Sequence, residues 1–460
     1  MITQDQLWNA LVITGSQVEL AKYILAAWRT EGDVVYCDGF YQYNVDTGTW
    51  SERAHDACKR DVLALTGRIY GAKTISHAGE IKQTRVRMTD RGCESVLRVA
   101  AAFANPRSRA DEPDFFANTP PGVLCKGTFL TLEGGDVVSR PPKPSDRQRI
   151  TLDIVYNPSA QCPMWTRALD DWFGGDDDGA DAIALLGEFV GGALFGVATT
   201  YQKALFLVAP GGNGKSQLLD VVSSLFPGGR AKAIRPQDWG NEYQRAELHH
   251  SRLNVVAELP SKAIAEGANF KAIVTGDPIG ARQIYQKPFT FRPRCAHIFS
   301  GNAFPLATDT SDGFWRRIVV LTMTRRFDGT PAEIRDLAHQ IINQELEGVL
   351  AWAARGARRL IANNAYTIPS SSERAVAVWR RESDPVATWM DQNTTPAPDP
   401  SSGTLAKELF LDYSAWCETF RFPGINLNNF SKALVRLLGP PKRRKWGRLH
   451  SLQLKSRIVR

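Results

Sequence analysis

One segment constrains the fold more than any other, the run LFLVAPGGNGKSQLLDVVSSLF at residues 205–226. An apolar strand leads into a glycine-rich turn, and the turn leads through Gly214, Lys215 and Ser216 into a helix. The glycines let backbone N–H groups surround phosphate oxygens, and the helix presents its positive N-terminal end. The segment therefore predicts a phosphate-binding P-loop on an α/β fold. Lys215 is expected to reach the β- and γ-phosphates of ATP, and the Ser216 hydroxyl to hold Mg²⁺.

The start of this loop departs from the usual spacing. Ala209 stands where the pattern G-x-x-x-x-G-K-S has its first glycine. The glycines at 211 and 212 offer alternative flexibility, and the effect of Ala209 on turnover stays open. The residues expected to contact the nucleotide are Gly211, Gly212, Asn213, Gly214, Lys215, Ser216 and Gln217.

Three further short apolar runs follow the loop: RLNVVAELP (252–260), CAHIFSGNAFP (295–305) and RRIVVLTM (316–323). Each is apolar on both faces, which is typical of a buried parallel strand. Together with the strand before the loop, they predict a parallel sheet.

Polar residues end two of these runs. Glu258 lies where a P-loop NTPase places the carboxylate that handles Mg²⁺ or the attacking water. Ala257 precedes it, so one carboxylate is expected to do both jobs. Asn302 follows the next strand and is expected to hydrogen-bond the γ-phosphate or the attacking water. A turn-forming role for Asn302 is the alternative.

Arg316 and Arg317 directly precede the last strand. Either can act as an arginine finger on the nucleotide of a neighbouring subunit, neutralising charge in the transition state. The alternative is structural ion pairing. The sequence does not separate the two arginines, although the position of Arg317 beside the strand favours it.

Four segments in this order resemble the superfamily 3 helicases of the AAA+ class, and most of all the phage, plasmid and poxvirus primase-helicases. They are APGGNGKS (209–216), NVVAELP (254–260), FKAIVTGDPIGARQIYQKPFTFRP (270–293) with IFSGNAFP, and GFWRRI (313–318). The third segment is similar to the family pattern K-x-x-x-[GT]-G-D-x-x-x-x-R followed by an aromatic hairpin. The matching positions are Lys271, Gly276, Asp277, Arg282 and Tyr285.

The resemblance implies a ring, usually a hexamer, with ATP between subunits and Arg316 or Arg317 completing the neighbour's site. It also implies that single-stranded DNA threads the pore past the hairpin ARQIYQKPFTF. Lys287 and Gln286 are expected at the tip of this hairpin and Tyr285 at its base. Polar and aromatic residues around a lysine can follow a phosphate backbone without reading its sequence. An ordinary surface hairpin is the alternative.

The region before the loop names no chemistry. Two strands are expected within 34–50, turning at Asp46–Gly48, followed by a largely helical stretch over 53–104. A hairpin is expected to turn near Gly134–Gly135, and a helical stretch to be broken by the acidic GGDDDG at 174–179. Because no D-x-D pair or zinc cluster occurs within residues 1–117, the chain resembles the helicase half without a primase, and a separate primase or polymerase is an expected partner.

The last segment is strongly basic. Residues 401–460 hold 12 Lys and Arg but 3 Asp and Glu. Two helices, the second capped by Asn428 or Asn429, and a basic hairpin turning near Trp446–Gly447 resemble a winged helix-turn-helix. A basic protein interface is the alternative to binding duplex DNA. The residues expected on DNA phosphates are Lys442, Arg443, Arg444, Lys445 and Arg448.

The predicted fold class is α/β, with a P-loop AAA+ parallel-sheet ATPase core, an N-terminal α/β region and a C-terminal winged-helix-like domain. The predicted domains are 1–117 (α/β, role unknown), 118–195 (mostly helical), 196–330 (ATPase core), 331–393 (helical), 394–403 (linker) and 404–460 (basic, winged-helix-like).

Composition excludes other classes. No apolar stretch is long enough for a transmembrane helix, and the N-terminus lacks a signal-peptide pattern. Seven scattered cysteines without a C-x-x-C pair favour reduced thiols in a cytoplasmic protein. The family resemblance implies that this cytoplasm is that of a bacterial host and that the protein is encoded by a phage or mobile element.

The leading hypothesis is an ATP-dependent, ring-forming DNA helicase of phage or plasmid replication. The second is an origin-binding initiator that uses ATP as an assembly switch without processive unwinding. The third, a packaging motor or nucleotide kinase, is disfavoured by the block at 270–293 and by the absence of a recognisable substrate lid.

Overall fold

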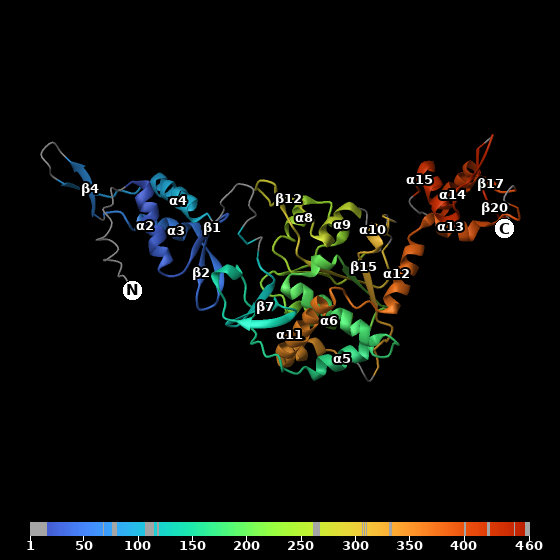
Figure 1. Cartoon of the computed structure of the whole chain (residues 1–460), viewed down its shortest axis with the longest axis horizontal. Helices are drawn as coiled ribbons and strands as arrows, with labels where there is room; N and C mark the ends of the chain where they lie inside the picture. The colour runs from blue at the N-terminus through green and yellow to red at the C-terminus, as the bar shows by residue number, and fades with distance from the viewer. Residues whose placement is uncertain are drawn as a thin grey trace.

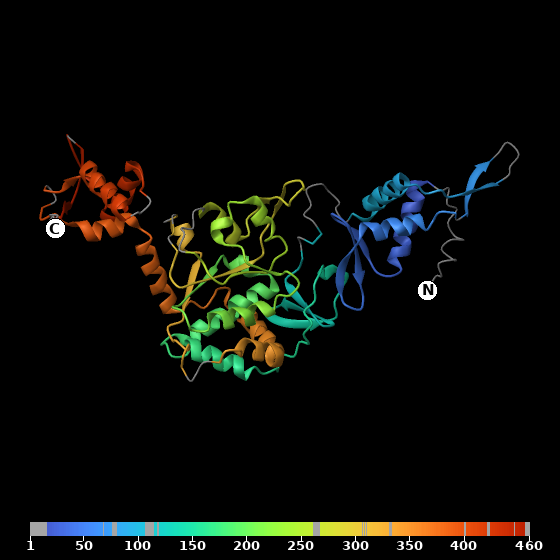
Figure 2. The ribbon, with the colours of Figure 1, turned by 180° about the vertical axis from the view of Figure 1, so that it is seen from behind.

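Three units follow one another along the long axis of the molecule, as two opposite views show (Figures 1 and 2). The computed structural model describes residues 16–67, 69–75, 81–105, 115–116, 119–260, 267–305, 307, 309, 311–330, 334–399, 402–420, 424–445 and 447–455, without the side chains of 69–75, 81–85, 420 and 444. Within these ranges, no helix combines the length and the apolar character needed to cross a bilayer.

The central unit contains a five-stranded parallel sheet in the order β10-β11-β14-β9-β15. Its strands are β9 (Ala204–Val208), β10 (Ala231–Lys232), β11 (Leu253–Val256), β14 (Ala296–Gly301) and β15 (Ile318–Thr322). All four residues of β11 and all six of β14 are buried, as expected for strands covered on both faces. The parallel sheet predicted from the four apolar runs is therefore confirmed.

Helices cover both faces of this sheet (Figure 1). One apolar cluster joins the first face to α5 (Pro163–Phe173), α6 (Gly179–Phe195), α7 (Lys215–Ser224) and α11 (Leu337–Asn363). A second cluster joins the other face to α8 (Glu242–Ala246), α9 (Gly267–Thr275), α10 (Asp312–Trp315) and α12 (Ser370–Glu382). Helices α5 and α6 flank the acidic stretch 174–179, as predicted.

Helices α6 and α11 cross in close contact. A Cβ atom on Gly191 or Gly356 would overlap the backbone of the opposite helix, so only glycine allows this approach. Two neighbouring helices held this close give the sheet a rigid support.

The N-terminal unit combines α2 (Gln17–Arg29), α3 (His55–Leu63) and α4 (Asp90–Ala104) with β1 (Val34–Tyr36), β2 (Phe40–Asn44) and β3 (Thr49–Arg53). The turn between β2 and β3 lies at 45–48, as predicted, but the sheet has a third strand. The largely helical expectation for 53–104 is wrong in part, because β4 (Ile69–Ile75) and β5 (Ile81–Arg85) form an antiparallel hairpin there.

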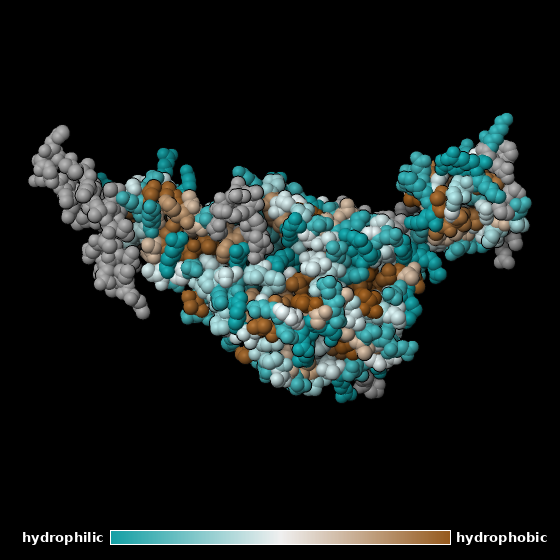
Figure 3. Space-filling view, viewed as in Figure 1, coloured by the Kyte–Doolittle hydropathy of each residue, from teal (hydrophilic) through white to brown (hydrophobic). Residues whose placement is uncertain are grey.

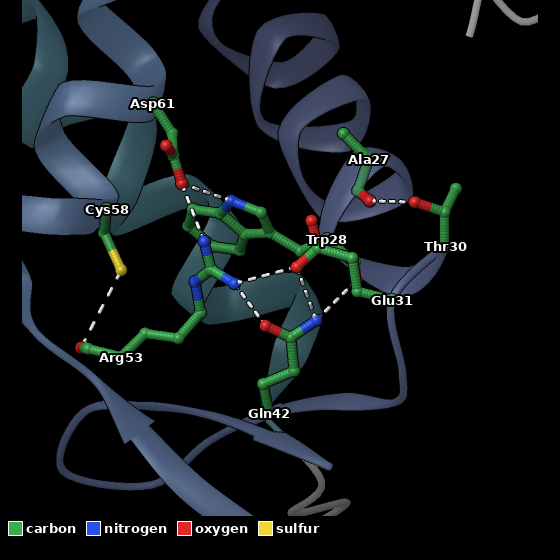
Figure 4. A network of polar contacts seen from close by, with 8 residues as sticks. All are labelled: Ala27, Trp28, Thr30, Glu31, Gln42, Arg53, Cys58 and Asp61. Atoms are coloured by element: carbon green, nitrogen blue, oxygen red, sulfur yellow. Dashed lines mark hydrogen bonds and ion pairs between the residues drawn. The ribbon is translucent and has the colours of Figure 1, made fainter. Parts of the chain in front are cut away.

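A polar network joins the elements of the N-terminal unit (Figure 4). The Asp61 carboxylate of α3 accepts hydrogen bonds from Trp28 Nε1 of α2 and from Arg53 Nη2 of β3, both at 2.8 Å. Gln42 Nε2 of β2 donates to the Trp28 carbonyl at 2.8 Å. The network is structural, since its hydrogen bonds join α2, α3, β2 and β3 to one another within the unit.

A second three-stranded sheet, β6 (Gly122–Cys125), β7 (Thr128–Glu133) and β8 (Asp136–Arg140), connects this unit to the central one. The turn between β7 and β8 lies at Gly134–Gly135, as predicted.

The C-terminal unit contains α13 (Pro385–Asn393), α14 (Ala406–Phe420) and α15 (Leu427–Leu438), with β16 (Thr394–Pro396), β17 (Thr404–Leu405), β18 (Lys442–Arg444), β19 (Gly447–His450) and β20 (Leu452–Leu454). Its start differs from the predicted linker at 394–403. Trp389 of α13 packs with Tyr413 and Phe430, and β16 pairs with β20. Helix α13 and strand β16 therefore belong to the C-terminal unit.

The cap of α15 also differs from the prediction. Asn426, rather than Asn428 or Asn429, precedes the helix, and its side chain accepts from the Asn429 N–H at 2.9 Å. In Figure 3, hydrophilic residues cover much of the visible face of the C-terminal unit around a smaller hydrophobic patch.

Candidate phosphate site and nucleic-acid surfaces

The segment between β9 and α7 forms a tight glycine-dependent loop. Gly212 and Gly214 have φ angles of 79° and 84°, in the left-handed region that favours glycine. Gly214 caps α7, so the first backbone N–H groups of this helix open toward the loop. Such a cradle can hold an anion. The predicted strand–loop–helix geometry is present.

The loop is fastened on two sides. The buried side chain of Asn213 donates to the Pro210 carbonyl and, at 3.2 Å, to the Met323 carbonyl just after β15. The Gly212 carbonyl accepts from the backbone N–H groups of Phe327 and Asp328, at 2.7 and 3.0 Å. The chain that follows β15 therefore fixes the shape of the loop.

Ala209 fits the position where the first glycine is usual. It is 1% exposed within the core cluster, and its N–H donates to the Gly301 carbonyl at 3.2 Å. Because Ala209 is not among the residues with a positive φ, its backbone does not require glycine.

Three of the predicted residues meet at the edge of the sheet where the parallel strands end, here named the carboxyl edge. Lys215 Nζ donates to Asn302 Oδ1 at 2.9 Å and also to the Ala209 carbonyl. Partial burial lowers the pKa of Lys215, while the nearby Glu258 carboxylate opposes that shift. A cation, a carboxylate and an amide therefore converge beside the loop.

Glu258 is exposed at this edge and faces a cavity of about 550 Å³. The other residues that line the cavity are Ala233, Ile234, Arg235, Asp238, Asn241, Gln244, Val256 and Ala257. A carboxylate beside open space can accept a proton from water or bind a metal through water. Among the described residues, no group of three or more His, Cys, Asp or Glu side chains is placed to hold a metal ion, the acidic stretch at 174–179 included.

The remaining loop residues differ in their surroundings. The Ser216 side chain is exposed, and a Cβ atom on Gly211 would meet nothing within 4 Å. The Gln217 amide binds the start of α11, donating to the Arg335 carbonyl at 2.8 Å and accepting from the Ala338 N–H at 2.7 Å. Gln217 therefore positions α7 rather than pointing freely into the loop.

The structure adds two residues that sequence reasoning missed. The Trp172 indole of α5 lies directly behind Gly214, where a Cβ atom would overlap it. Arg326 lies over the loop, because a Cβ atom on Gly212 would sit 3.4 Å from Arg326 Nε. Arg326 is held by Asp328 at 3.1 Å. Both residues are far from the loop in sequence, so only the fold brings them there.

The two candidate finger arginines lie at the opposite edge of the sheet, where the strands begin, here named the amino edge. Arg317 is 7% exposed and donates to Thr275 Oγ1 at 3.0 Å and to the Gly313 carbonyl. Burial lowers its pKa, and the neighbouring charge of Arg316 lowers it further. Arg316 is exposed. Of the two, Arg316 has the side chain free to meet another molecule.

The expected hairpin consists of β12 (Ile279–Ala281) and β13 (Phe289–Phe291), paired antiparallel. The strands have three residues each, so residues 282–288 form the loop. The expectation that Tyr285 lies at the base is therefore wrong. Tyr285 is fully exposed at the tip with a φ of 63°, beside the exposed Gln286 and Lys287.

The family-like residues around the hairpin have structural roles. Lys271 pairs with Asp309 at 2.8 Å, and Gly276 has a φ of 76° that favours glycine. Arg282 Nε donates to the Gln286 carbonyl at 3.2 Å, across the hairpin loop. Asp277 is exposed.

A basic surface covers the hairpin of β18 and β19. Lys442, Arg443, Lys445 and Arg448 are exposed, and in the described part of the chain none of them forms an ion pair. The Arg444 side chain and Trp446 lie outside the described residues. Unpaired cations on an exposed hairpin are suited to a polyanion.

Two family models match parts of the chain. Residues 21–174 match the family described as D5 N terminal like, and residues 207–317 match a family of unknown function, DUF5906. The second match contains the phosphate loop, Glu258, Asn302, the hairpin and both arginines. No curated protein matches the chain.

Among solved structures, the chain is similar to apo structures of the NrS-1 C-terminal region. One is 13% identical, with a TM-score of 0.46, over 92% of this chain and 87% of that one. Two others, described as A forms, have TM-scores of 0.44. They are 10% identical over 95% and 100% of the two chains, and 11% identical over 77% and 74%. The D5 N terminal like match supports the relationship to primase-helicase-type replication proteins that the sequence resemblance indicates.

Proposed function

We propose that the chain is an ATP-dependent DNA helicase of the AAA+ superfamily 3 type, acting as a ring in phage or plasmid replication. The observation that carries this proposal is the convergence of Lys215, Glu258 and Asn302 on a glycine-bent loop at the carboxyl edge. Ligands of open α/β sheets bind at this edge, where neighbouring strands connect in opposite directions.

Each group at the carboxyl edge then has a task. The loop amides and Lys215 bind the β- and γ-phosphates of ATP. The Asn302 amide, which accepts a hydrogen bond from Lys215, orients the γ-phosphate or the attacking water. Glu258 accepts the proton of that water. Ser216 and Glu258 would hold Mg²⁺, which supplies charge neutralisation on the phosphate oxygens when bound.

The arginine finger is proposed to act between copies. Arg316 begins at the amino edge, separated from the chain's own loop by the length of β15, so it meets the nucleotide of a neighbouring copy rather than its own. Its exposure favours it over Arg317, whose donors are bonded within the chain. A closed ring, expected to be a hexamer, provides such a neighbour for every site.

The DNA contacts are proposed for two exposed basic surfaces. The tip of the hairpin offers Tyr285 for stacking on bases, with Gln286 and Lys287 for the phosphate backbone of a single strand. The C-terminal unit, with two helices followed by a basic antiparallel hairpin, is proposed to act as a winged-helix-like duplex binder. A separate primase or polymerase would complete the replication reaction.

An assembly-switch initiator is the second candidate, favoured by the separate basic surface of the C-terminal unit. ATP hydrolysis measured with and without single-stranded DNA distinguishes the two. The proteins are the wild type, Lys287→Ala at the hairpin tip, and Lys126→Ala, which changes an exposed lysine in the turn between β6 and β7. We expect stimulation by DNA in the wild type and in Lys126→Ala, and its loss in Lys287→Ala.

The other outcomes are equally informative. Hydrolysis that ignores DNA in all three proteins favours the assembly switch. Absence of hydrolysis in the wild type contradicts both candidates.

A further inference from the structure

The short helix α8 touches both the cavity at Glu258 and the exposed hairpin. Asn241, which caps α8, and Gln244 within it line the same cavity as Glu258. The buried Ala246 anchors the helix in the core cluster of this face. Helix α8 and its cap therefore supply two of the residues that line the cavity beside Glu258.

The other side of α8 holds the hairpin. Arg245 Nε donates to the Gly280 carbonyl in β12 at 2.8 Å. The Arg282 N–H, where β12 ends, donates to the Glu242 carbonyl at 3.2 Å. These two bonds join α8 to the strand that leads to the hairpin tip.

Arg245 also stiffens the chain before α8. Its Nη1 donates to the carbonyls of Trp239 and Gly240, at 2.8 and 3.0 Å. Trp239 is fully buried and stacks on Phe270 of α9. One guanidinium thus ties a buried anchor, the cavity-lining helix and the hairpin strand together, and its planar fork suits several fixed acceptors.

We propose that Arg245 is a positioning residue that couples the nucleotide site at Glu258 to the DNA-contacting hairpin through α8. This inference rests on the proposed function. When the groups around Glu258 shift between nucleotide states, Asn241 and Gln244 shift with them, and Arg245 carries that displacement to Gly280. Since Gly280 pairs with Thr290 in β13, both strands of the hairpin move as one body.

The test compares Arg245→Met and Arg245→Lys with Arg167→Met. Methionine keeps an apolar stem but removes every donor, whereas lysine keeps the charge without the fork. Arg167 is an exposed arginine on α5, so its variant is a matched control. For each protein one measures kcat and KM for ATP without DNA, affinity for single-stranded DNA, and the stimulation of kcat by saturating DNA.

For Arg245→Met we expect wild-type kcat, KM and DNA affinity, with stimulation by DNA reduced by about 2- to 30-fold. Arg245→Lys should fall between this variant and the wild type, and Arg167→Met should match the wild type. Full stimulation in Arg245→Met overturns the coupling, and so does loss of its DNA-free hydrolysis, which would place Arg245 in the nucleotide site or the fold. A wild type that DNA does not stimulate contradicts the proposed function instead.

Discussion

The carboxyl and amino edges of the central sheet differ in how their polar side chains are bonded. At the carboxyl edge, Lys215 donates a hydrogen bond to Asn302, and the negative charge of the nearby Glu258 carboxylate raises the pKa of Lys215 against the effect of burial. At the amino edge, Arg317 is bonded within the chain, whereas Arg316 is exposed. This difference favours the proposal in which one copy would supply the groups that bind phosphate and activate water, while its exposed Arg316 would serve a neighbouring copy.

The largest expected effect is a loss of ATP hydrolysis in Arg316→Ala that Arg317→Ala should not match. Arg316→Ala should lower kcat for ATP by about 1,000-fold or more, as removal of an arginine finger does, with unchanged thermal stability. Arg317→Ala should instead lower the free energy of unfolding by about 3 kcal/mol, because it removes a buried side chain and leaves its partly buried partners without their guanidinium. Steady-state hydrolysis and thermal denaturation of both variants check this. The reverse pattern would transfer the finger to Arg317.

The carboxyl edge is tested by Lys215→Ala and Asn302→Ala. Each should lower kcat by about 100- to 1,000-fold, since each removes a group aimed at developing charge. Because the two side chains bond each other, the double variant should be little worse than the poorer single one. Fully multiplicative losses would show that the two residues act independently.

A smaller effect is expected from two glycines of the same loop. Gly214→Ala should weaken nucleotide binding by about 1–3 kcal/mol, because the residue has a left-handed φ and its new Cβ atom would overlap the Trp172 indole. In Gly211→Ala the added Cβ atom would lie in open space, so the free energy of nucleotide binding should change by less than about 0.5 kcal/mol. Binding of a fluorescent nucleotide measures both. Equal losses would mean that the loop rearranges on binding.

The smallest effect concerns the C-terminal hairpin. Lys442→Ala and Arg443→Ala should each reduce the slope of log K for duplex DNA against log salt by about 0.9, if each neutralises one phosphate. Lys126→Ala provides the control. Titrations over a range of salt measure the slopes. Unchanged slopes would reassign the hairpin to a protein partner.

Two kinds of feature can be predicted from the sequence. Some depend only on residues adjacent in the chain, and others follow because parallel strands end at the same edge of the sheet. The loop before Lys215 follows from adjacent residues, and Glu258 and Asn302 follow from the rule that such strand ends share an edge. The sequence does not separate the roles of Arg316 and Arg317, because the hydrogen-bond partners of Arg317, Thr275 and the Gly313 carbonyl, are set by the fold.

The missed features depend on distant pairing. The predicted start of the C-terminal unit at residue 404 is too late, because β16 at 394–396 pairs with β20 near the end of the chain. The resemblance predicts Tyr285 at the hairpin base, but it does not fix strand length, and strands of only three residues leave Tyr285 in the loop. Arg326 reaches the loop only through the path of the chain after β15.

The most direct test of a site shared between copies is ATP hydrolysis by a mixture of Lys215→Ala and Arg316→Ala. Each variant alone should be inactive. In the mixture, the intact loop of Arg316→Ala can meet the intact Arg316 of Lys215→Ala, so hydrolysis should recover to a substantial fraction of the wild-type rate. A mixture that assembles as the wild type does, yet stays inactive, would contradict completion of the site by a neighbouring copy.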